Sequence, residues 1–139
     1  MEKLRFPLFL FALAGAAMFA WCCGSSTSIS GLIRQPQSIN LSPATADAQN
    51  YPDGQVQFIA TGHYNTAPYT VSPQSATWGA CYQNATTTAV SVTNGGLAQC
   101  AHGASGTYTI FAFVMTNCNA ITACGGGCTV VGTAQLTCP

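Results

Sequence analysis

The stretch that decides the fold is residues 55–64, QVQFIATGHY, in which the character of the side chain changes from one position to the next. If this stretch is extended, one face carries Val56, Phe58, Ala60, Gly62 and Tyr64. The opposite face carries the more polar set Gln57, Ile59, Thr61 and His63. A period of two is typical of a half-buried β-strand, whereas a helix would need a period of 3.6. The sequence therefore predicts a strand here, with its apolar face on a core.

Further short strands are predicted on either side of this one, separated by turn residues. They cover residues 38–41, 76–80, 90–92, 97–100, 107–115 and 129–137. We expect Trp78 to point inward, and Asn94-Gly95-Gly96 to supply the positive φ angles of a tight turn. About seven short strands in roughly 100 residues are typical of a sandwich of the immunoglobulin type rather than a barrel. We therefore expect an all-β, Ig-like β-sandwich over residues 38–139.

Charged side chains are scarce throughout the chain. Lys and Arg number three, Asp and Glu number three, and charged residues make up 4% of the 139 residues. A typical soluble protein has about 25%. A chain without net positive charge lacks the electrostatic footprint of nucleic-acid binding. Sets of acid, base and nucleophile are missing as well, so we expect a single non-enzymatic domain without a cofactor or a metal.

The N-terminal residues 1–23 have the pattern of an export signal. Lys3 and Arg5 precede an almost unbroken apolar run over residues 6–21. This run is shorter than the roughly 20 residues that a membrane span needs, which favours a signal over an uncleaved membrane anchor. Residues 24–37 would then form a Gly/Ser-rich tether ahead of the domain.

Two cysteines, Cys22 and Cys23, directly follow the apolar run. This order resembles a bacterial lipoprotein signal, in which the cysteine after the run becomes the lipidated N-terminus. Trp21 departs from that pattern, which prefers a small residue there, so signal cleavage without lipidation is the alternative. We expect an exported protein, either a cell-envelope lipoprotein or a secreted one, that touches the membrane only through such a lipid anchor.

Six cysteines follow the signal, and in a small exported domain an even number indicates a disulfide framework. These six are Cys81, Cys100, Cys118, Cys124, Cys128 and Cys138. The alternative is a metal site formed by Cys118, Cys124, Cys128 and Cys138. The expected strand directions bring Cys81 and Cys100 to the same end of the sandwich, which favours a Cys81–Cys100 bridge.

Five segments follow one another in the order of a known pattern. They are Ser38-Ile39-Asn40-Leu41-Ser42-Pro43, residues 57–64, Ala76-Thr77-Trp78, Gly96-Leu97-Ala98 and residues 103–110. Their order resembles the bacterial Ig-like domain, group 2, over about residues 38–137. The resemblance implies an Ig-like sandwich that serves as a spacer or adhesive module. The family's usual pattern lacks the cysteines, and the resemblance identifies no binding residue.

Few residues in this chain could carry chemistry. His63 falls on the polar face of its strand and has no partner at metal-ligand spacing. Cys100 and His102 share a face, but no third group would orient them as a nucleophile and base. Asp53 belongs to a Pro-Asp-Gly turn, and with Asp47 it offers too few carboxylates for calcium.

Phe111, Phe113 and Met115 form an apolar row in the sequence, because they alternate with the residues of their strand that are expected to face the core. If this row is exposed, it marks a partner surface. The alternative, which we favour, is that the loop of residues 118–128 or the chain before Ile39 covers it.

Taken together, these features predict a non-catalytic exported module with a structural or adhesive role at the cell envelope. Its partners would be envelope proteins or surface glycans. The alternative is a small carbohydrate-binding domain whose aromatic side chains stack on sugar rings. The candidates for that role are Tyr51, Tyr69, Tyr82 and Trp78. A fully buried Trp78 could not stack on a glycan.

Overall fold

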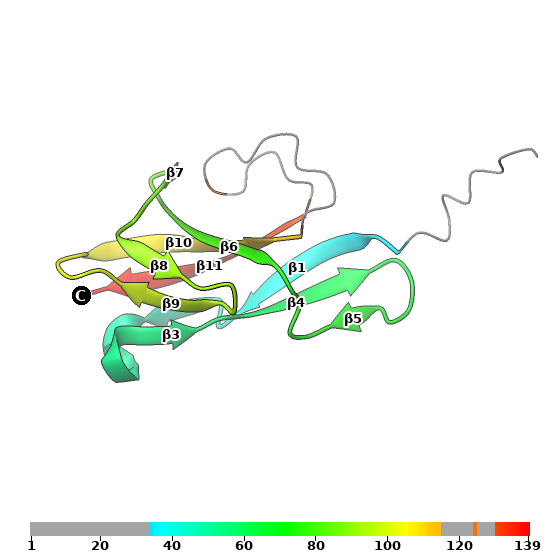
Figure 1. Ribbon diagram of the computed structural model, residues 1–139, viewed down its shortest axis with the longest axis horizontal. Helices are drawn as coiled ribbons and strands as arrows, with labels where there is room; N and C mark the ends of the chain where they lie inside the picture. Colours follow the sequence, from blue (N-terminus) through cyan, green and yellow to red (C-terminus); the bar gives the residue numbers. More distant parts are fainter. Residues whose placement is uncertain (1–33, 115–123, 125–129) are drawn as a thin grey trace, which may run out of the picture. The chain divides into compact units, whose positions relative to one another are not determined.

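The computed structural model describes residues 34–114, 124 and 130–139, and these form an all-β structure with two short 3-10 turns (Figure 1). The first strands are β1 (Pro36–Ser42), β2 (Thr45–Asp47), β3 (Gln55–Gln57), β4 (Ile59–Tyr64), β5 (Thr70–Val71) and β6 (Thr77–Tyr82). They are followed by β7 (Ala85–Thr86), β8 (Val90–Val92), β9 (Leu97–Cys100), β10 (Gly106–Phe113) and β11 (Val131–Cys138). The 3-10 turns are η1 (Ala48–Asn50) and η2 (Pro52–Gly54). None of the helices in this described part is long and apolar enough to cross a membrane.

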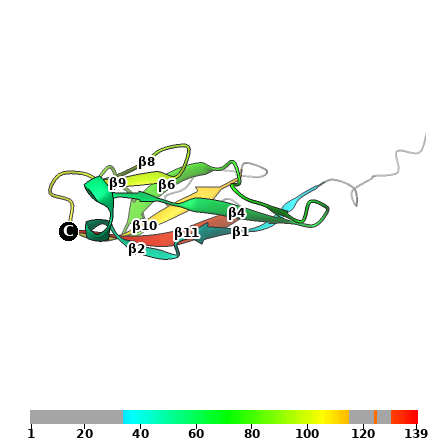
Figure 2. The ribbon, with the colours of Figure 1, turned by 90° about the horizontal axis from the view of Figure 1, so that it is seen from below.

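The strands form the two layers of a β-sandwich. One layer is the five-stranded sheet β2-β11-β10-β6-β7. The other contains β1-β4-β5 and β3-β9-β8, which follow each other along the chain because only Phe58 separates β3 from β4 (Figure 2). Buried residues from both layers join in one apolar core, among them Leu41, Phe58, Ile110 and Leu136. The prediction of an all-β sandwich is confirmed.

The two ends of the sandwich are formed by different segments of the chain. At the end that we call the N-terminal pole, Pro36 at the start of β1 pairs with Tyr64 at the end of β4. At the C-terminal pole, Gly106 at the start of β10 pairs with Cys138 at the end of β11. Because β2 runs parallel to β11, the chain advances from the first pole to the second between Pro36 and Asp47.

The alternating stretch 55–64 behaves as its pattern predicts. Val56, Phe58 and Ala60 are buried, whereas Ile59 is exposed. The predicted single strand is interrupted at one residue, since the Phe58 N–H donates to the carbonyl of Gly96 at 2.9 Å. The alternation of faces therefore continues through a break in the strand.

Other boundaries agree closely with the sequence. Strands β8 and β9 have the predicted bounds, and β10 and β11 differ from the predicted strands by one or two residues at each end. Strand β1 begins at Pro36, inside the predicted tether of residues 24–37. Three strands were not predicted, namely β2, β5 and β7. Each has only two or three residues, and none has the apolar-polar-apolar alternation of Val90-Ser91-Val92 in β8.

Phe111 and Phe113 do not form an exposed row, so the hypothesis of a partner surface there is wrong. They are 5% and 1% exposed and make a second apolar cluster with Cys81, on the face of the sheet away from the main core. Their rings stack with centroids 6.2 Å apart, and Phe111 lies over Gly79 of the neighbouring strand β6. Cys124 packs against this cluster, and the rest of the loop that was expected to cover it lies outside the described residues. Met115 lies outside the described residues.

Among the described residues two disulfides are present, and neither is the predicted Cys81–Cys100 bridge. Cys100 is bonded to Cys138 with their Cα atoms 5.9 Å apart, and Cys81 is bonded to Cys124 with 5.5 Å between Cα atoms. The prediction is wrong because Cys81 faces the Phe111 cluster, whereas Cys138 belongs to the core between the layers.

The other predictions about cysteines concern residues that the structure does not describe. Cys118 and Cys128, like Cys22 and Cys23 of the predicted signal, lie outside the described residues. The alternative of a four-cysteine metal site loses two of its members, since Cys124 and Cys138 are each bonded to another cysteine.

Tyr108 stabilises the turn that precedes β10. Its side chain is 6% exposed, and its hydroxyl donates to the carbonyl of Ser105 at 3.2 Å. We expect Tyr108→Phe to lower the free energy of unfolding by about 0.5–1.5 kcal/mol, the usual net contribution of one neutral hydrogen bond. Urea denaturation measures this difference. Tyr82→Phe is the control, because Tyr82 is 42% exposed, and no loss in Tyr108→Phe beyond that control would contradict the role of the hydroxyl.

Candidate functional site

The aromatic residues predicted to stack on sugars do not form one site. Tyr69 is 65% exposed in the turn that precedes β5, at the N-terminal pole. Tyr82 lies at the end of β6 toward the C-terminal pole and packs on Tyr108, with ring centroids 5.1 Å apart. Trp78 is half-buried, packs against the main core and lies against Gly96. These three aromatic side chains therefore cannot act together on one ligand.

The two histidines differ in their contacts. His63 has side-chain partners, and His102 has none within the described part of the protein. His63 lies between Asn40 Nδ2 at 3.3 Å and Thr70 Oγ1 at 3.4 Å, on the outer face of the β1-β4-β5 sheet. His102 is exposed in the loop after β9. Within the described ranges, no group of three or more His, Cys, Asp or Glu residues could hold a metal ion.

A hollow of about 530 Å³ lies beside Trp78 and is lined by Phe58, Ile59 and Pro73. Two of the three amide side chains on its wall, those of Gln57 and Gln74, are engaged within the protein, whereas that of Asn94 has no partner among the described residues. Gln57 Nε2 donates to the carbonyls of Phe58 and Gly95, and Gln74 Oε1 accepts from the Tyr64 hydroxyl at 2.6 Å. This hollow therefore offers apolar surface but few uncommitted polar groups.

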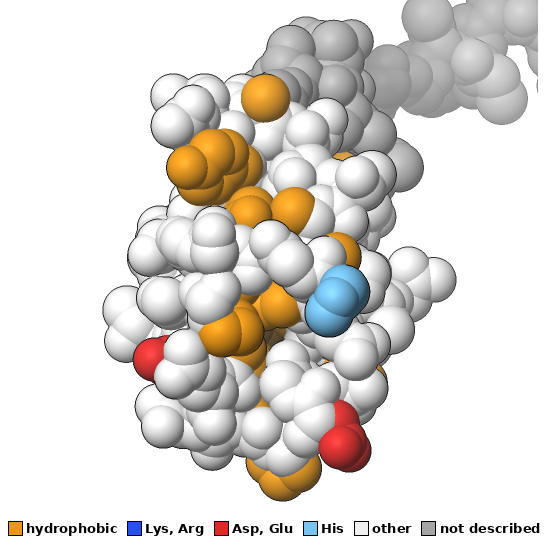
Figure 3. All heavy atoms as spheres, turned by 90° about the vertical axis from the view of Figure 1, so that its left-hand side faces the viewer, with side chains coloured by type: hydrophobic (Ala, Val, Ile, Leu, Met, Phe, Trp, Pro, Cys, Tyr) orange, Lys and Arg blue, Asp and Glu red, His pale blue; other side chains and the backbone are white. Residues whose placement is uncertain are grey.

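A second hollow, of about 420 Å³, opens at the C-terminal pole. Three segments that are far apart in the sequence line it: residues 48–54 around the 3-10 turns, residues 100–104 after β9, and Pro139 after β11. Figure 3 looks at this end of the domain, where apolar side chains are visible in the middle of a mostly polar face. Sequence spacing alone could not have brought these segments together.

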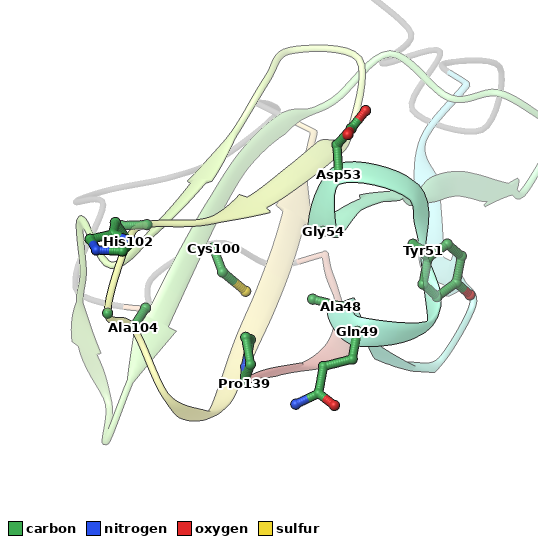
Figure 4. Close-up of a pocket in the computed structure, with 11 residues that line it drawn as sticks. Ala48, Gln49, Tyr51, Asp53, Gly54, Cys100, His102, Ala104 and Pro139 are labelled. Atoms are coloured by element: carbon green, nitrogen blue, oxygen red, sulfur yellow. The ribbon is translucent and has the colours of Figure 1, made fainter.

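We call this second hollow the polar-end hollow because it lies at one pole of the sandwich. It has an apolar floor and a polar rim. Figure 4 shows Ala48, Cys100 and Pro139 around its centre, and Ala104 beside His102 at one side. Gln49, Tyr51, Asp53 and His102 lie farther out, and the Asp53 carboxylate and the Tyr51 ring point away from the centre. Tyr51 is 37% exposed, so its ring presents a substantial surface to solvent.

Hydrogen bonds fix the backbone that carries this rim. The Asp47 side chain accepts from the N–H of Gln49 at 3.0 Å and caps η1. The N–H of Tyr51 then donates to the carbonyl of Ala48, and that of Gly54 donates to the carbonyl of Tyr51, both at 3.2 Å. Asp53 has a positive φ of 55°, a conformation that Asp and Asn adopt more readily than most residues. The backbone of the turn is therefore fixed by its own hydrogen bonds.

The opposite wall is fixed as well. The N–H of Ala104 donates to the carbonyl of Ala101 at 3.0 Å, which closes the turn that carries His102. Immediately below, Cys100 is bonded to Cys138. The disulfide thus ties the 100–104 segment to the end of β11, where Pro139 follows.

The rim side chains are uncommitted and include no Lys or Arg. Across the described residues, the side chains of Gln49, Asp53 and His102 make no hydrogen bond to the rest of the protein. Arg34 is the one Lys or Arg in that part of the chain, and it lies at the N-terminal pole. There its guanidinium donates to the carbonyl of Pro68 at 2.7 Å and covers the Tyr64 ring at 3.6 Å.

A shallower hollow adjoins this one, and Tyr82, Thr88 and Ser105 line it. His102 and Ala104 belong to both hollows. Tyr82 is already packed on Tyr108, and no carboxylate or amide side chain lines this shallower hollow. The polar-end hollow therefore combines more kinds of binding group than either of the other two.

Comparison with known proteins adds no identification. No protein-family model matches the chain, and no curated protein matches it significantly. The structure itself defines the class of protein: a disulfide-stapled all-β sandwich with a small hollow at one pole.

Sequence reasoning reached only part of this site. Tyr51 was a candidate as one of several loop tyrosines, whereas Asp53 and His102 are interpreted from the sequence as structural, and Gln49 has no signal of its own. The Pro52-Asp53-Gly54 turn was the one local feature that could have directed attention to this pole.

Proposed function

We propose that the protein is a non-catalytic, exported module with an adhesive role at the cell envelope. The observation that carries this proposal is the Cys100–Cys138 bond, which joins a strand of one layer to a strand of the other. Disulfides of this kind form and persist in an oxidising, extracellular environment and are rare in the cytosol. The Cys81–Cys124 bond adds a second staple on the outer face.

The N-terminal sequence supports export and attachment to the envelope. A positively charged start and an apolar run over residues 6–21 fit a secretory signal, and Cys22 or Cys23 could carry a lipid. A lipidated cysteine followed by a Gly/Ser-rich tether would hold the sandwich at the membrane surface.

The resemblance to the bacterial Ig-like domain, group 2, is in keeping with an adhesive or spacer role. Strand β10 pairs with both β11 and β6, and β2 switches layers to run parallel to β11. The Tyr108 hydroxyl bonds back to the backbone three residues earlier, as in the tyrosine corner of Ig-type sandwiches. These features support an Ig-like assignment within the all-β sandwich.

The placement of the two poles favours adhesion over a purely structural role. The described chain starts at the N-terminal pole, and the polar-end hollow lies at the C-terminal pole. A module tethered through its N-terminal segment would therefore present this hollow away from the membrane.

Fractionation of the natural producer, with intact mass measured before and after reduction, tests the proposal. We expect the protein in the envelope or the medium, without residues of the signal, and a mass gain of four hydrogens from the two described bonds. A gain of six would mean that Cys118 and Cys128 are bonded too. A lipid mass on Cys22 or Cys23 would establish the anchor.

The adhesive role has its own readout. Producer cells that lack the protein should attach less to their natural surface than cells in which it has been restored. A cytosolic protein with reduced thiols would overturn the proposal of export, and unchanged attachment would overturn the adhesive role.

A further inference from the structure

We propose that Asn94 is a site of spontaneous deamidation, at which the backbone nitrogen of Gly95 attacks the side-chain amide. Asn94 and Gly95 are both exposed in the turn between β8 and β9. The reaction replaces an uncharged side chain with a carboxylate and alters the backbone of the turn. This inference is independent of the adhesive role proposed above.

The sequence singles out this asparagine. It is the one asparagine of the chain that precedes a glycine, whereas each of the others is followed by a residue with a side chain. Because glycine has no Cβ, other groups can approach its backbone closely. Even a Cβ added at Gly95 would have only Thr93 Oγ1 nearby, at 3.8 Å, so the space beside this residue is open.

Both reacting groups are free of hydrogen bonds within the described part of the protein. The Asn94 amide lines the hollow beside Trp78 without a partner there, and the N–H of Gly95 donates to no described acceptor. The Asn94 carbonyl accepts no hydrogen bond from these residues either. Type I and type II turns differ mainly in the orientation of this central peptide plane, and glycine fits the third position of both. The plane can therefore rotate without breaking a hydrogen bond.

The rest of the turn is held, which keeps the reacting groups close to each other. The N–H of Gly96 donates to the carbonyl of Thr93 at 2.9 Å and closes the turn. The carbonyl of Gly95 accepts from Gln57 Nε2 at 2.7 Å. Rotation of the free peptide plane can thus bring the Gly95 nitrogen against Asn94 Cγ while the turn stays closed, and such proximity favours an intramolecular reaction.

The reaction is an acyl transfer within the chain, followed by hydrolysis. The Gly95 nitrogen gives its proton to a solvent base and forms a bond to Asn94 Cγ. The bond between Cγ and Nδ2 breaks, and Nδ2 takes up a proton and leaves as ammonia. Water then opens the resulting five-membered imide at either carbonyl, which gives aspartate or isoaspartate. Water is the only reactant that the protein does not supply.

Both products change the surroundings of the turn. A carboxylate at position 94 would stand on the wall of a hollow whose lining contains no Asp, Glu, Lys, Arg or His. Isoaspartate also adds one carbon to the main chain between Thr93 and Gly96. The hydrogen bond that closes the turn and the bond from Gln57 to Gly95 cannot then both keep their lengths. We expect the isoaspartyl form to unfold at a lower urea concentration than fresh protein.

Tandem mass spectrometry of the natively exported protein, aged at neutral and at mildly alkaline pH, tests the proposal. We expect a gain of one dalton at Asn94, with isoaspartate among the products. The gain should appear faster at the higher pH, because the attacking nitrogen must lose a proton. The internal control is Asn84, which is also exposed in a turn but is followed by Ala85. Deamidation at Asn94 should be several times faster than at Asn84.

Two variants test the attack by Gly95. Gly95→Ala places a methyl group beside the attacking nitrogen, and Asn94→Gln would have to form a six-membered ring. Each should lose most of the mass gain at position 94 and leave the rate at Asn84 unchanged. Thermal unfolding of each variant verifies that it is folded.

Three results would overturn the inference. The first is a gain at Asn94 no faster than at Asn84, and the second is a gain that persists at the same rate in folded Gly95→Ala. The third is aspartate without isoaspartate, which would mean direct hydrolysis of the amide by water. An unchanged urea midpoint in the isoaspartyl form would contradict the effect on the turn.

Discussion

Gly96→Ala will lower the free energy of unfolding by about 2–6 kcal/mol, more than any surface substitution in this domain. Gly96 has a φ of +83°, which costs a residue with a Cβ roughly 1–3 kcal/mol. A Cβ at this position would also collide with the Phe58 carbonyl oxygen and approach Trp78 Cζ2 to 2.8 Å. Since a backbone atom cannot rotate away as a side chain can, overpacking adds about 1–3 kcal/mol.

The neighbouring glycine is the matched control for this prediction. In Gly95→Ala, the new methyl group would have only Thr93 Oγ1 nearby, at 3.8 Å, and the residue has no positive φ. We expect its unfolding free energy to change by less than about 0.5 kcal/mol. Urea denaturation followed by tryptophan fluorescence measures both variants. Trp78 is the only tryptophan after the predicted signal, and it lies against the mutated turn. Equal losses in the two variants would contradict the argument.

The same glycine explains why the sequence predicts residues 55–64 so well and yet misses the break at Phe58. Alternation reports which face a side chain occupies, and Val56, Phe58 and Ala60 all remain on the core side. The break arises because the Phe58 N–H bonds to Gly96, a contact between residues 38 positions apart. A local pattern contains no information about such a partner, although the Asn-Gly-Gly turn itself was predictable.

The error in the cysteine pairing has a different origin, because the sequence contained the means to avoid it. Cys81 lies three residues after Trp78 in the same strand, and an odd separation places the two side chains on opposite faces. Once Trp78 points inward, Cys81 must point outward, toward Phe111. The predicted pairing takes into account the end of the sandwich at which each cysteine lies. It leaves out the face of the sheet to which each side chain points, and it is therefore wrong.

The candidate site was the least predictable feature. Its walls come from residues 48–54, from residues 100–104 and from Pro139, and no spacing rule connects these segments. They meet because β2 pairs in parallel with the end of β11, and because Cys100 is bonded to Cys138. Both contacts depend on the whole sandwich. From the sequence, Tyr51 and Asp53 are a loop tyrosine and a turn residue, and only the assembled pole places them around the same hollow as His102.

Removal of the Cys100–Cys138 bond by Cys100→Ala with Cys138→Ala will lower the free energy of unfolding by about 4 kcal/mol. The bond closes a loop of 38 residues, and the restriction that it imposes on the unfolded chain contributes about that amount. Since domains of this size are stable by about 5–15 kcal/mol in total, the variant should be close to unfolding at physiological temperature. Denaturation of the variant and of the oxidised parent protein in urea gives the difference directly.

A single substitution establishes that the loss belongs to this bond. In Cys138→Ala, Cys100 should become a free thiol that an alkylating reagent labels in denaturant without any reductant, while Cys81 and Cys124 stay unlabelled. A Cys81–Cys100 bond would instead leave Cys100 protected in that variant. Labelling therefore distinguishes the pairings independently of stability. An unlabelled Cys100 would contradict the Cys100–Cys138 pairing. A double variant as stable as the parent would mean that the apolar core alone holds the two layers together and that this bond adds little.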